Sequence, residues 1–406
     1  MSQDPPRDPD RRPHHHPETL AVHAGRSVDP ETGAVAPALH SSTTFERDPD
    51  GAYSRGHIYA RNSNPTRARL EECLAALEDG AGAWSFSSGS AATSAVLQCL
   101  EPGMHVVVTE DAYHGTRHLL DTLFRRWGIR HDRVDTSDTD AVASALRPET
   151  RLLWIESPSN PLQRVADLEA LAELAAEREV VTVCDNTLAS PVRQNPLRHG
   201  IDLVVHSTTK YLGGHSDLLG GAVIGREHGP WHDELAEIQA TAGAISSPRD
   251  DWLLLRSLAT LPVRVERQAG TAGALAEWLA GHPAVAEVFH PALEDHPQRE
   301  RVARYLPGGT GLLALRMKGG ETAAWKLVQG VRLFTRATSL GGVESLIEHR
   351  ASIEDAATRT PPDLVRISVG LEHPEDLLGD LKQALAHCPT APGQPQSDNP
   401  QDGGRA

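Results

Sequence analysis

The feature that most constrains the fold is a series of short apolar segments, each followed at once by a polar turn. These segments are GAWSF (82–86), HVVVT (105–109), RLLWI (151–155), VVTVC (180–184) and DLVVH (202–206). Longer helical stretches separate them, which predicts an α/β domain with a largely parallel sheet. Open sheets of this kind bind ligands beyond the carboxyl ends of their strands. The five polar turns therefore predict a binding site at one edge of the sheet.

The first of these turns contains a glycine and leads into a helix. GAWSF is followed by SSGSAATSAVLQCL, where Gly89 ends the strand and an alanine-rich helix begins. Such a turn presents free N–H groups and the positive end of the helix dipole. Gly89 and Ser90 are therefore candidates for binding a phosphate, although the same pattern also serves as ordinary helix capping.

The sequence changes character near residue 260. LPVRVERQAGTAGALAEWLAGH (261–282) predicts a long helix that leads into a second, smaller α+β domain. Within that domain, GTGLLALRMKG (309–319) and DLVRISVGLE (363–372) have the pattern of strands. The polar ends of the chain, 1–17 and 389–406, are typical of disordered tails.

Composition and charge disfavour several classes of protein. The chain has 39 Lys+Arg and 55 Asp+Glu, and its formal net charge of −16 disfavours nucleic acid and anionic membranes as partners. No apolar run reaches the roughly 18 residues of a membrane span, and the first residues lack the apolar core of a signal peptide. With 406 residues, 39% of them hydrophobic, the default interpretation is a cytoplasmic enzyme.

Neither the cysteines nor the histidines predict a metal site. The cysteines lie far apart, form no CxxC pair and are more typical of buried apolar positions: Cys73, Cys99, Cys184 and Cys388. HHHP (14–17) could bind a metal, but its Pro, Arg and Asp neighbours favour a flexible polar tail. We therefore expect no metal.

Lys210 is a candidate for covalent chemistry. The chain has only three other lysines, Lys318, Lys326 and Lys382, in segments typical of solvated surface. Lys210, in HSTTKYLGGHSD (206–217), follows a β-branched strand and precedes two glycines. Limited hydration there would lower its pKa and leave a neutral amine able to form a Schiff base with a carbonyl. A lysine that bridges a carboxylate in a turn is an equally good interpretation of this residue alone.

Asp185 favours the first interpretation. It follows a strand as the only acidic residue of VVTVCDNTLAS, where a carboxylate needs a cationic partner or hydrogen bonds. The protonated pyridine nitrogen of pyridoxal phosphate is such a partner, and its charge makes the cofactor an effective electron sink. Ser207 and Thr209 offer hydroxyls for the phosphate. Tyr113 offers an aromatic face for the ring, although an isolated tyrosine is more often part of a core.

Seven motifs in a fixed order resemble those of a known family. They are SSGSAAT, DAYHGT, ESPSNP, DNTLASP, HSTTKYLGGHSD, SLGGVESLIEH and VRISVGLE. Together they resemble the Cys/Met-metabolism PLP-dependent enzymes, the trans-sulfuration group, over about residues 18 to 388. The resemblance implies the aminotransferase-like fold type I, with a mostly parallel sheet in the large domain and a smaller C-terminal α+β domain. It also implies small amino-acid substrates and a homotetramer built from tight dimers.

The resemblance also predicts how the chain is divided. An N-terminal arm, 18–62, would contact the neighbouring subunit. A PLP-binding domain, 63–260, and a C-terminal domain, 261–388, would follow. Tyr59 and Arg61 in IYARNSNPTR match a pair that reaches the cofactor phosphate of the neighbouring subunit, so each active site would need two chains.

By the same resemblance, Lys210 would be the Schiff-base lysine and proton carrier, Asp185 the partner of the pyridine nitrogen, and Tyr113 the stacking ring. The phosphate would be held within the chain by Gly89, Ser90, Ser207 and Thr209. Arg366 would bind the substrate α-carboxylate, because a planar fork suits bidentate pairing. Ser339 would assist it, and Asn160 would lie near the phenolic oxygen of the cofactor.

The exact reaction depends on motifs that depart from the family pattern. DAYHGT is similar to γ-synthases and γ-lyases, but Thr338 stands before SLGG where those enzymes often have a glutamate. Arg350 replaces the proline of a common EHPA. This added cation could favour an anionic group such as the succinyl of O-succinylhomoserine, or it could bridge Glu348 or Glu354.

We expect cystathionine γ-synthase activity, in which L-cysteine replaces the acyl group of an O-acyl-L-homoserine. The alternatives are γ- or β-elimination from L-cystathionine. An inactive regulator of the same fold is disfavoured because Lys210, Asp185, Tyr113 and Arg366 are all present. A nicotinamide-binding enzyme is disfavoured because no GxGxxG follows the first strand.

Overall fold

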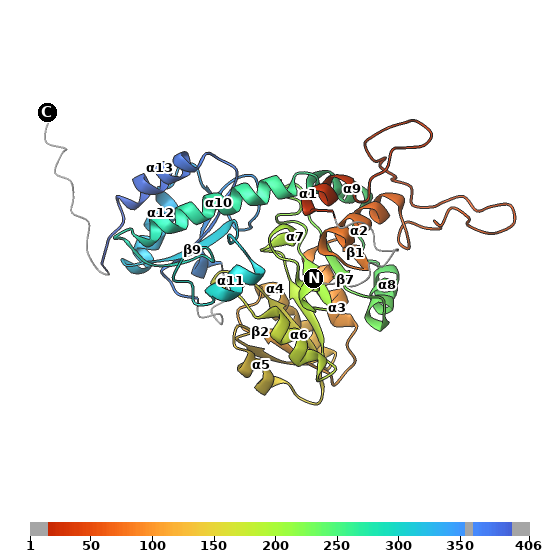
Figure 1. Cartoon of the computed structure of the whole chain (residues 1–406), viewed down its shortest axis with the longest axis horizontal. Helices are drawn as coiled ribbons and strands as arrows, with labels where there is room; N and C mark the ends of the chain where they lie inside the picture. The colour runs from red at the N-terminus through yellow and green to blue at the C-terminus, as the bar shows by residue number, and fades with distance from the viewer. Residues whose placement is uncertain (1–14, 354–359, 392–406) are drawn as a thin grey trace, which may run out of the picture.

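The computed structural model describes residues 15–353 and 360–391 (Figure 1). A larger part surrounds a seven-stranded sheet, and a smaller C-terminal part surrounds a five-stranded sheet. Helix α10 (Leu261–Ala280) runs from the larger part across the smaller one, as predicted for 261–282 (Figure 1). In the part of the chain that is described, no helix is both long and apolar enough to cross a membrane.

The large sheet has the strand order β1-β7-β6-β5-β4-β2-β3. In that order, the strands are Gly82–Phe86, Gly221–Gly225, Leu203–His206, Val181–Asp185, Thr150–Glu156, His105–Thr109 and Arg130–Val134. Only β7 runs against its neighbours, β1 and β6, so the other six strands share one direction. The five predicted strands are confirmed as β1, β2, β4, β5 and β6, with ends shifted by at most one residue. Their carboxyl ends consequently meet at one edge.

The sequence patterns did not reveal β3 and β7. β3 has the sequence RHDRV and lies at the sheet edge, where its polar side chains remain partly or fully exposed. β7 has the sequence GAVIG, whose two glycines are typical of a turn rather than a strand. Both belong to the sheet through pairing with apolar neighbours, which is a tertiary effect.

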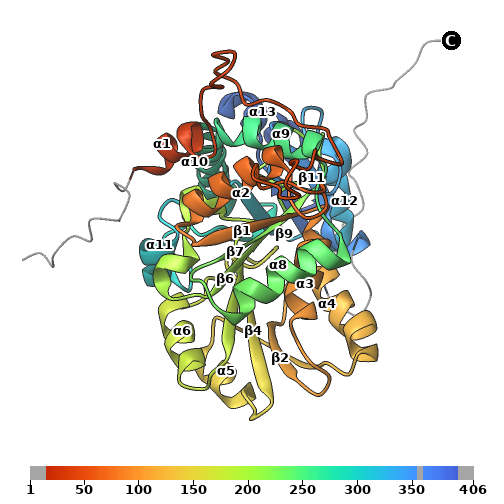
Figure 2. The ribbon, with the colours of Figure 1, turned by 90° about the vertical axis from the view of Figure 1, so that its right-hand side faces the viewer.

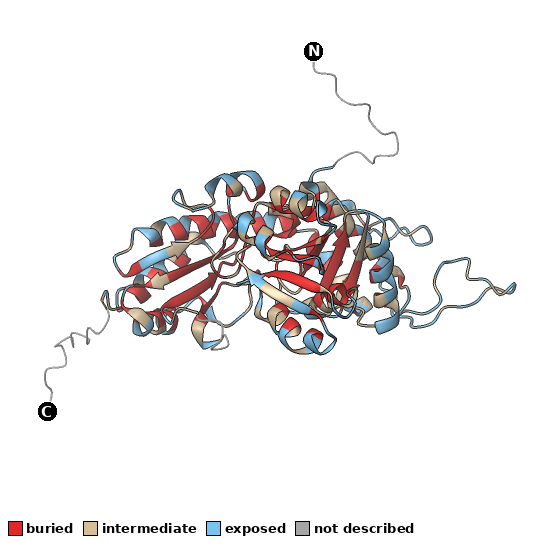
Figure 3. Ribbon diagram, turned by 90° about the horizontal axis from the view of Figure 1, so that it is seen from below, coloured by how far each residue is buried: buried red, intermediate tan, exposed pale blue. Residues whose placement is uncertain are grey.

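Helices cover both faces of the large sheet (Figure 2). α5 (Thr139–Ala145) and α6 (Leu168–Ala176) lie on one face. On the other lie α3 (Gly89–Gln98), α4 (His114–Leu119) and α8 (Pro230–Ala242). Successive strand residues alternate between the two cores, with Val106 and Val108 on the α3 side and Val107 on the α6 side. Burial on both faces explains why the central strands are continuous apolar runs (Figure 3).

The remaining helices of the larger part complete its surface. They are α1 (Pro17–His23), α2 (Pro65–Glu78), the π-helical turn η1 (Leu120–Phe124), α7 (Ser190–Arg193), the 3-10 turn η2 (Pro196–His199) and α9 (Pro248–Leu258). α1 begins inside the segment 1–17 that was predicted as a tail. The rest of that tail, 1–14 with His14 of HHHP, lies outside the described residues, as does 392–406 of the predicted C-terminal tail.

The C-terminal sheet has the strand order β10-β11-β12-β9-β8 and is mostly antiparallel. In that order, its strands are Thr335–Arg336, Leu346–His349, Leu364–Ser368, Leu312–Met317 and Val285–Phe289. α11 (Arg299–Tyr305), α12 (Gly320–Gly330), η3 (Arg350–Ser352) and α13 (Pro374–Leu385) accompany it. The predicted strands in 309–319 and 363–372 are confirmed as β9 and β12.

Residues 24–64 form an extended arm between α1 and α2. The arm contains no helix, and its isolated bridge joins Thr44 to Tyr59. In Figures 1 and 3 it projects from the body as long, mostly exposed loops. Few residues of the arm are buried, so the arm depends on contacts with other surfaces to keep one conformation.

Two expectations about exposure were wrong in part. Cys99 is only partly buried, unlike the other three cysteines, because it caps the end of α3 near the surface. Lys326 is half-buried in α12, whereas Lys318 and Lys382 are exposed as expected.

Candidate active site

A cavity of about 280 Å³ lies between the two parts, at the carboxyl ends of β4, β5 and β6. Nine of the predicted site residues line it: Gly89, Ser90, Tyr113, Asn160, Asp185, Ser207, Lys210, Ser339 and Arg366. The larger part contributes the first seven, and the smaller part contributes Ser339 and Arg366. The position of the cavity at the carboxyl edge of the sheet agrees with the binding site predicted from the polar turns.

Lys210 lies in the turn that follows β6, with its side chain directed into the cavity. Its Nζ donates a hydrogen bond to Ser339 Oγ at 2.8 Å. Burial, together with the Arg366 guanidinium, lowers the pKa of Lys210 from its ordinary 10.5 to about 8, and Glu348 partly opposes this shift. A substantial fraction of this amine is therefore neutral near pH 8, which is the form that attacks a carbonyl.

Asp185 ends β5 and opens on the same cavity. Its Oδ1 accepts a hydrogen bond from the Thr187 amide at 3.0 Å. Burial raises the pKa of Asp185, while the Thr187 hydrogen bonds and His206 oppose the rise. Among the ion pairs found within residues 15–353 and 360–391, none includes Asp185. The carboxylate therefore has room for a cationic partner inside the cavity.

Glu156 is a second buried carboxyl in the cavity wall, and the sequence predictions did not include it. It pairs in register with Asp185 across β4 and β5. Its Oε2 accepts the Tyr113 amide N–H at 2.6 Å. Burial and then the Asp185 charge raise the pKa of Glu156 well above its ordinary value. The sequence signal that could have identified Glu156 as a site residue is its position at the start of the polar turn ESPSNP.

The Gly89 turn packs against the turn that carries Lys210. A Cβ at Gly89 would lie 2.9 Å from Ser207 Cβ, so the two turns can pack this closely only with a glycine at position 89. Ser88 caps α3 by accepting the Ala91 amide at 3.1 Å. The first amides of a helix have no intrahelical acceptor, so Gly89 and Ser90 offer donors to an anion beside the Ser207 hydroxyl. This cradle fits a phosphate.

Tyr113 lies over the cavity with half of its surface exposed, at 50%. A Cβ at Gly115 would lie 2.4 Å from Tyr113 Cε1, so a side chain at position 115 would displace the ring. The glycine of DAYHGT thus has a packing role that the motif alone did not explain.

Arg366 on β12 is buried and directed at the cavity, which excludes the interpretation of an exposed strand residue. Its guanidinium donates to Asn160 Oδ1 at 3.2 Å and to the Ser339 carbonyl at 2.9 Å. It also pairs with Glu348 Oε1 at 2.9 Å. Ser339 has a φ of 95°, a conformation that non-glycine residues rarely adopt. Such strain at a cavity wall is typical of functional positions.

Thr338 and Arg350 also line the cavity. Arg350 Nη1 pairs with Glu348 Oε1 at 2.8 Å, so the predicted bridge to Glu348 is present. The other predicted partner, Glu354, lies outside the described residues. Glu348 therefore lies between two arginines. It was missed as a site residue because β11, which carries it, was not predicted as a strand.

Three predicted residues lie away from this cavity. The Thr209 hydroxyl accepts the Gly220 amide at 3.0 Å and does not line the cavity. Tyr59 and Arg61 lie on the arm and are exposed. Arg61 donates to the Ala240 carbonyl at the end of α8. Within one chain, the structure therefore does not bring Tyr59 and Arg61 to the site.

The cavity residues fit pyridoxal phosphate. Gly89, Ser90 and Ser207 could hold its phosphate, and Asp185 could pair with a protonated pyridine nitrogen. Lys210 has the lowered pKa that covalent attachment to an aldehyde requires. The sheet order and the position of Lys210 after β6 place the chain among the PLP-dependent enzymes of fold type I, the aminotransferase-like class.

Comparison with known proteins narrows this class to a family. A family model described as Cys/Met metabolism PLP-dependent enzyme matches residues 18–386. The chain is 49% identical over 375 residues to a cystathionine gamma-synthase of Mycobacterium bovis, covering 91% of this chain and 96% of that relative. It is 40% identical over 379 residues to a cystathionine beta-lyase of Coxiella burnetii, covering 91% and 98%.

A solved structure agrees with these sequence matches. The crystal structure of cystathionine gamma-lyase (CalE6) from Micromonospora echinospora has a TM-score of 0.87 and 41% identity, covering 92% of this chain and 99% of that chain. The chain belongs to the Cys/Met metabolism PLP-dependent enzyme family. It is a PLP-dependent enzyme that acts on carbon–sulfur bonds, as the trans-sulfuration prediction stated.

Replacement of Lys210 by alanine should abolish the visible absorption band of bound PLP. Turnover should fall by about 10²–10⁴-fold, the contribution of a positioned general base. Absorption spectra and steady-state kinetics of the purified variant measure both. Lys318→Ala, which removes an exposed lysine, is the control and should retain both properties. A Lys210→Ala protein that keeps the band and the activity would show that another amine holds the cofactor.

The lowered pKa of Lys210 predicts the pH dependence of cofactor uptake. The ammonium form predominates below about pH 8 and the reactive neutral amine above it. The rate at which apoprotein takes up PLP should therefore rise with pH and level off above about 8. Stopped-flow absorption across the pH range measures this midpoint. A rate that rises instead through the ordinary lysine pKa of 10.5 would contradict a desolvated Lys210.

Proposed function

We propose that the protein catalyses γ-replacement, in which L-cysteine displaces the acyl group of an O-acyl-L-homoserine to give cystathionine. The observation that carries the proposal is the contact between Lys210, Ser339 and Arg366. Lys210 Nζ and Arg366 Nη2 both contact Ser339, at Oγ and at the carbonyl respectively. An amino acid bound through its α-carboxylate to Arg366 would place its α-carbon toward Lys210.

Each residue then has a defined task. When bound, pyridoxal phosphate supplies an electron sink for negative charge at the α-carbon. Asp185 keeps the pyridine nitrogen protonated, and Tyr113 covers the ring. Lys210, as a neutral amine, removes the α-proton. Once that proton has passed to the bound cofactor–substrate pair, the amine is free to remove a proton from the β-carbon, and both carbons regain a proton after the exchange. Expulsion of the γ-acyloxy group as a carboxylate and addition of the cysteine sulfur at the γ-carbon complete the exchange.

The cavity wall also bears on the choice of acyl group. Arg350 lies on the cavity, and both Arg350 and Arg366 pair with Glu348. We propose that the group beyond the γ-carbon lies toward Arg350 and Thr338. A guanidinium on this wall is a charged hydrogen-bond donor, so an anionic acyl group such as succinyl would suit it better than a neutral one.

Elimination from L-cystathionine is the alternative. The same Lys210 and Arg366 placement serves a γ- or β-lyase, because both reactions begin with removal of the α-proton. The names of the Coxiella burnetii relative and of the Micromonospora echinospora structure favour this alternative. The higher identity to a γ-synthase, 49% against 40% and 41%, supports γ-replacement as the first choice.

We propose further that two chains complete each site and that the working form is a homotetramer, a dimer of dimers. The arm projects from the body (Figure 1), and Tyr59 on the arm is 47% exposed and does not line the cavity of its own chain. Exposed apolar residues continue along the arm at Val28, Val35 and Leu39. A neighbouring subunit is the surface against which such an arm would be buried.

Incubation of the PLP-loaded enzyme with L-cystathionine alone tests the reaction. We expect cystathionine to remain intact, and O-succinyl-L-homoserine with L-cysteine to yield cystathionine and succinate. Mass spectrometry identifies the products, and the Lys210→Ala protein is the control. Cysteine with 2-oxobutyrate would identify a γ-lyase, homocysteine with pyruvate would identify a β-lyase, and either outcome overturns the γ-synthase assignment.

Mixed oligomers test the shared site. Arg61→Ala and Lys210→Ala proteins should each be impaired, because one lacks the arm cation and the other lacks the reactive amine. A hybrid dimer contains one site with both an intact Lys210 and an intact Arg61, so activity should return after co-refolding. Absence of recovery in verified hybrids would show that Arg61 does not act across subunits.

A further inference from the structure

Arg67 is a buried cation with no role in the cavity. It lies in the first turn of α2, beneath the arm, and is 2% exposed. Its Nη1 donates to the Ala60 carbonyl at 2.8 Å, and its Nη2 donates to the carbonyls of Arg61 and Asn62 at 3.2 and 2.9 Å. One guanidinium thus binds three successive main-chain carbonyls. A guanidinium presents its five N–H donors in a rigid planar fork, whereas a lysine ammonium has three donors that rotate about one atom.

These carbonyls belong to the turn that carries Tyr59 and Arg61. The turn is closed by the amides of Asn62 and Ser63, which donate to the Tyr59 carbonyl at 2.9 and 3.1 Å. Arg67 binds the same turn from below. Its own position is fixed because the Asn64 side chain caps α2 and accepts the Arg67 amide at 3.4 Å. Arg67 therefore connects the exposed arm to helix α2.

The charge of Arg67 is compensated by Glu71, a carboxylate that also contacts the large sheet. Its Nε lies 3.6 Å from Glu71 Oε1, one turn along α2. Glu71 Oε1 also accepts the Ser85 amide at 2.9 Å and Gln239 Nε2 at 2.8 Å. Burial raises the pKa of Glu71 to about 7, and Arg67 opposes this rise. Ser85 lies in β1, so Glu71 connects the first turns of α2 to the large sheet.

We propose that Arg67 is a positioning residue that holds the turn Tyr59–Asn62 in the conformation in which Tyr59 and Arg61 meet the neighbouring subunit's cavity. The proposal rests on the arm acting across subunits, as proposed above. A buried arginine is costly to desolvate, and the three carbonyl contacts account for its presence. Arg67 touches neither substrate nor cofactor, and its effect is on the partner's active site rather than on its own.

The test distinguishes an effect of Arg67 on the active site of the partner chain from an effect on the site of its own chain. In an Arg67→Met homodimer every site receives a misplaced arm, and we expect weaker PLP binding and about 10²-fold lower kcat/KM. In a hybrid of Arg67→Met with Lys210→Ala, the site that keeps Lys210 receives an intact arm from the other chain. That site should regain wild-type PLP affinity, by absorption titration, and wild-type KM. If the substitution instead damaged only the active site of its own chain, that site would stay impaired in the hybrid.

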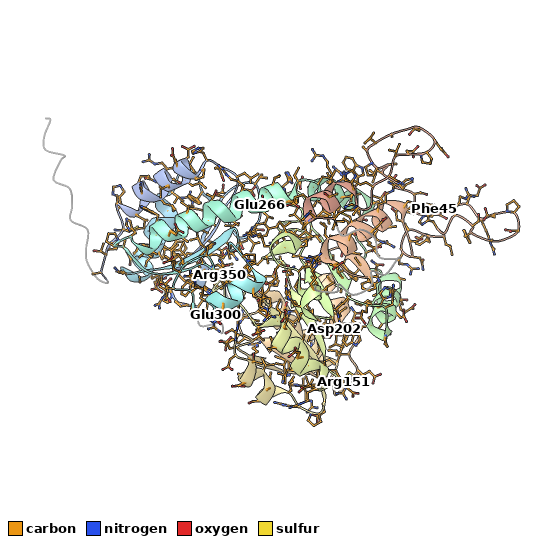
Figure 4. The ribbon with its side chains drawn as sticks, in the orientation of Figure 1. Phe45, Arg151, Asp202, Glu266, Glu300 and Arg350 are labelled. Carbon is orange, nitrogen blue, oxygen red and sulfur yellow. The ribbon has the colours of Figure 1, made fainter. Side chains whose placement is uncertain are left out.

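Two further variants sharpen the experiment. Arg67→Lys keeps the positive charge but removes the planar guanidinium. We expect this variant to fold, and we expect its PLP binding and kcat/KM to fall as they do in Arg67→Met. Arg151→Met is the matched control. Arg151 Nη1 also donates to two main-chain carbonyls, those of Pro148 and Thr150, both at 2.8 Å, but the residue is exposed. Figure 4 shows it well away from Phe45 on the arm. Its kinetics and PLP affinity should equal those of the unmodified enzyme.

The outcomes separate this proposal from the shared site itself. Recovery in both the Arg67→Met and the Arg61→Ala hybrids supports positioning across subunits. Recovery in the Arg61→Ala hybrid alone overturns the role of Arg67, because its effect would then lie within its own chain. Failure of both hybrids overturns the shared site and the positioning role together. If Arg67→Met does not fold, the Arg67→Lys hybrid gives the same three outcomes.

Discussion

Two carboxyl groups, Glu156 and Asp185, lie side by side at the ends of β4 and β5, and the site is organised around the compensation of their charges. Thr187 stabilises the charged form of Asp185, whereas Asp185 itself raises the pKa of Glu156. Burial raises the pKa of both carboxyls, but the Thr187 hydrogen bonds oppose the rise at Asp185, whereas the Asp185 charge adds to the rise at Glu156. A protonated pyridine nitrogen is the cation that we propose for Asp185.

Substrate recognition depends on contact between the two sheets. Arg366, on the C-terminal sheet, donates to Asn160 in a turn of the large sheet. Ser339 binds Lys210 and Arg366 at once, and it therefore lies between the proposed reactive amine and the proposed carboxylate anchor. Helix α10 contributes residues to the cores of both parts. In the proposed reaction, the groups that bind and deprotonate the amino acid come from both parts.

The sequence predicts the strands whose pattern is set by burial on both faces, together with the residues that directly follow them. Lys210, Asp185 and Gly89 belong to that group. β3 and β7 were missed because an edge position and a glycine-rich strand remove the apolar signal. Glu348 and Arg67 were missed for another reason, because their roles depend on contacts with segments that are distant or irregular. The position of Thr209 outside the cavity could likewise not be deduced from spacing.

The scarcity of lysine has a consequence for how the protein acquires its cofactor. An aldehyde condenses with amines and not with guanidinium groups under mild conditions, and only four of the 39 basic residues are lysines. Lys318 and Lys382 are exposed, whereas Lys210 lines the cavity and its pKa is lowered to about 8. A surface rich in arginine therefore provides solubility and ion pairs while offering few competing targets to a reactive carbonyl. Selective loading of one amine is in this way a property of the composition of the whole chain.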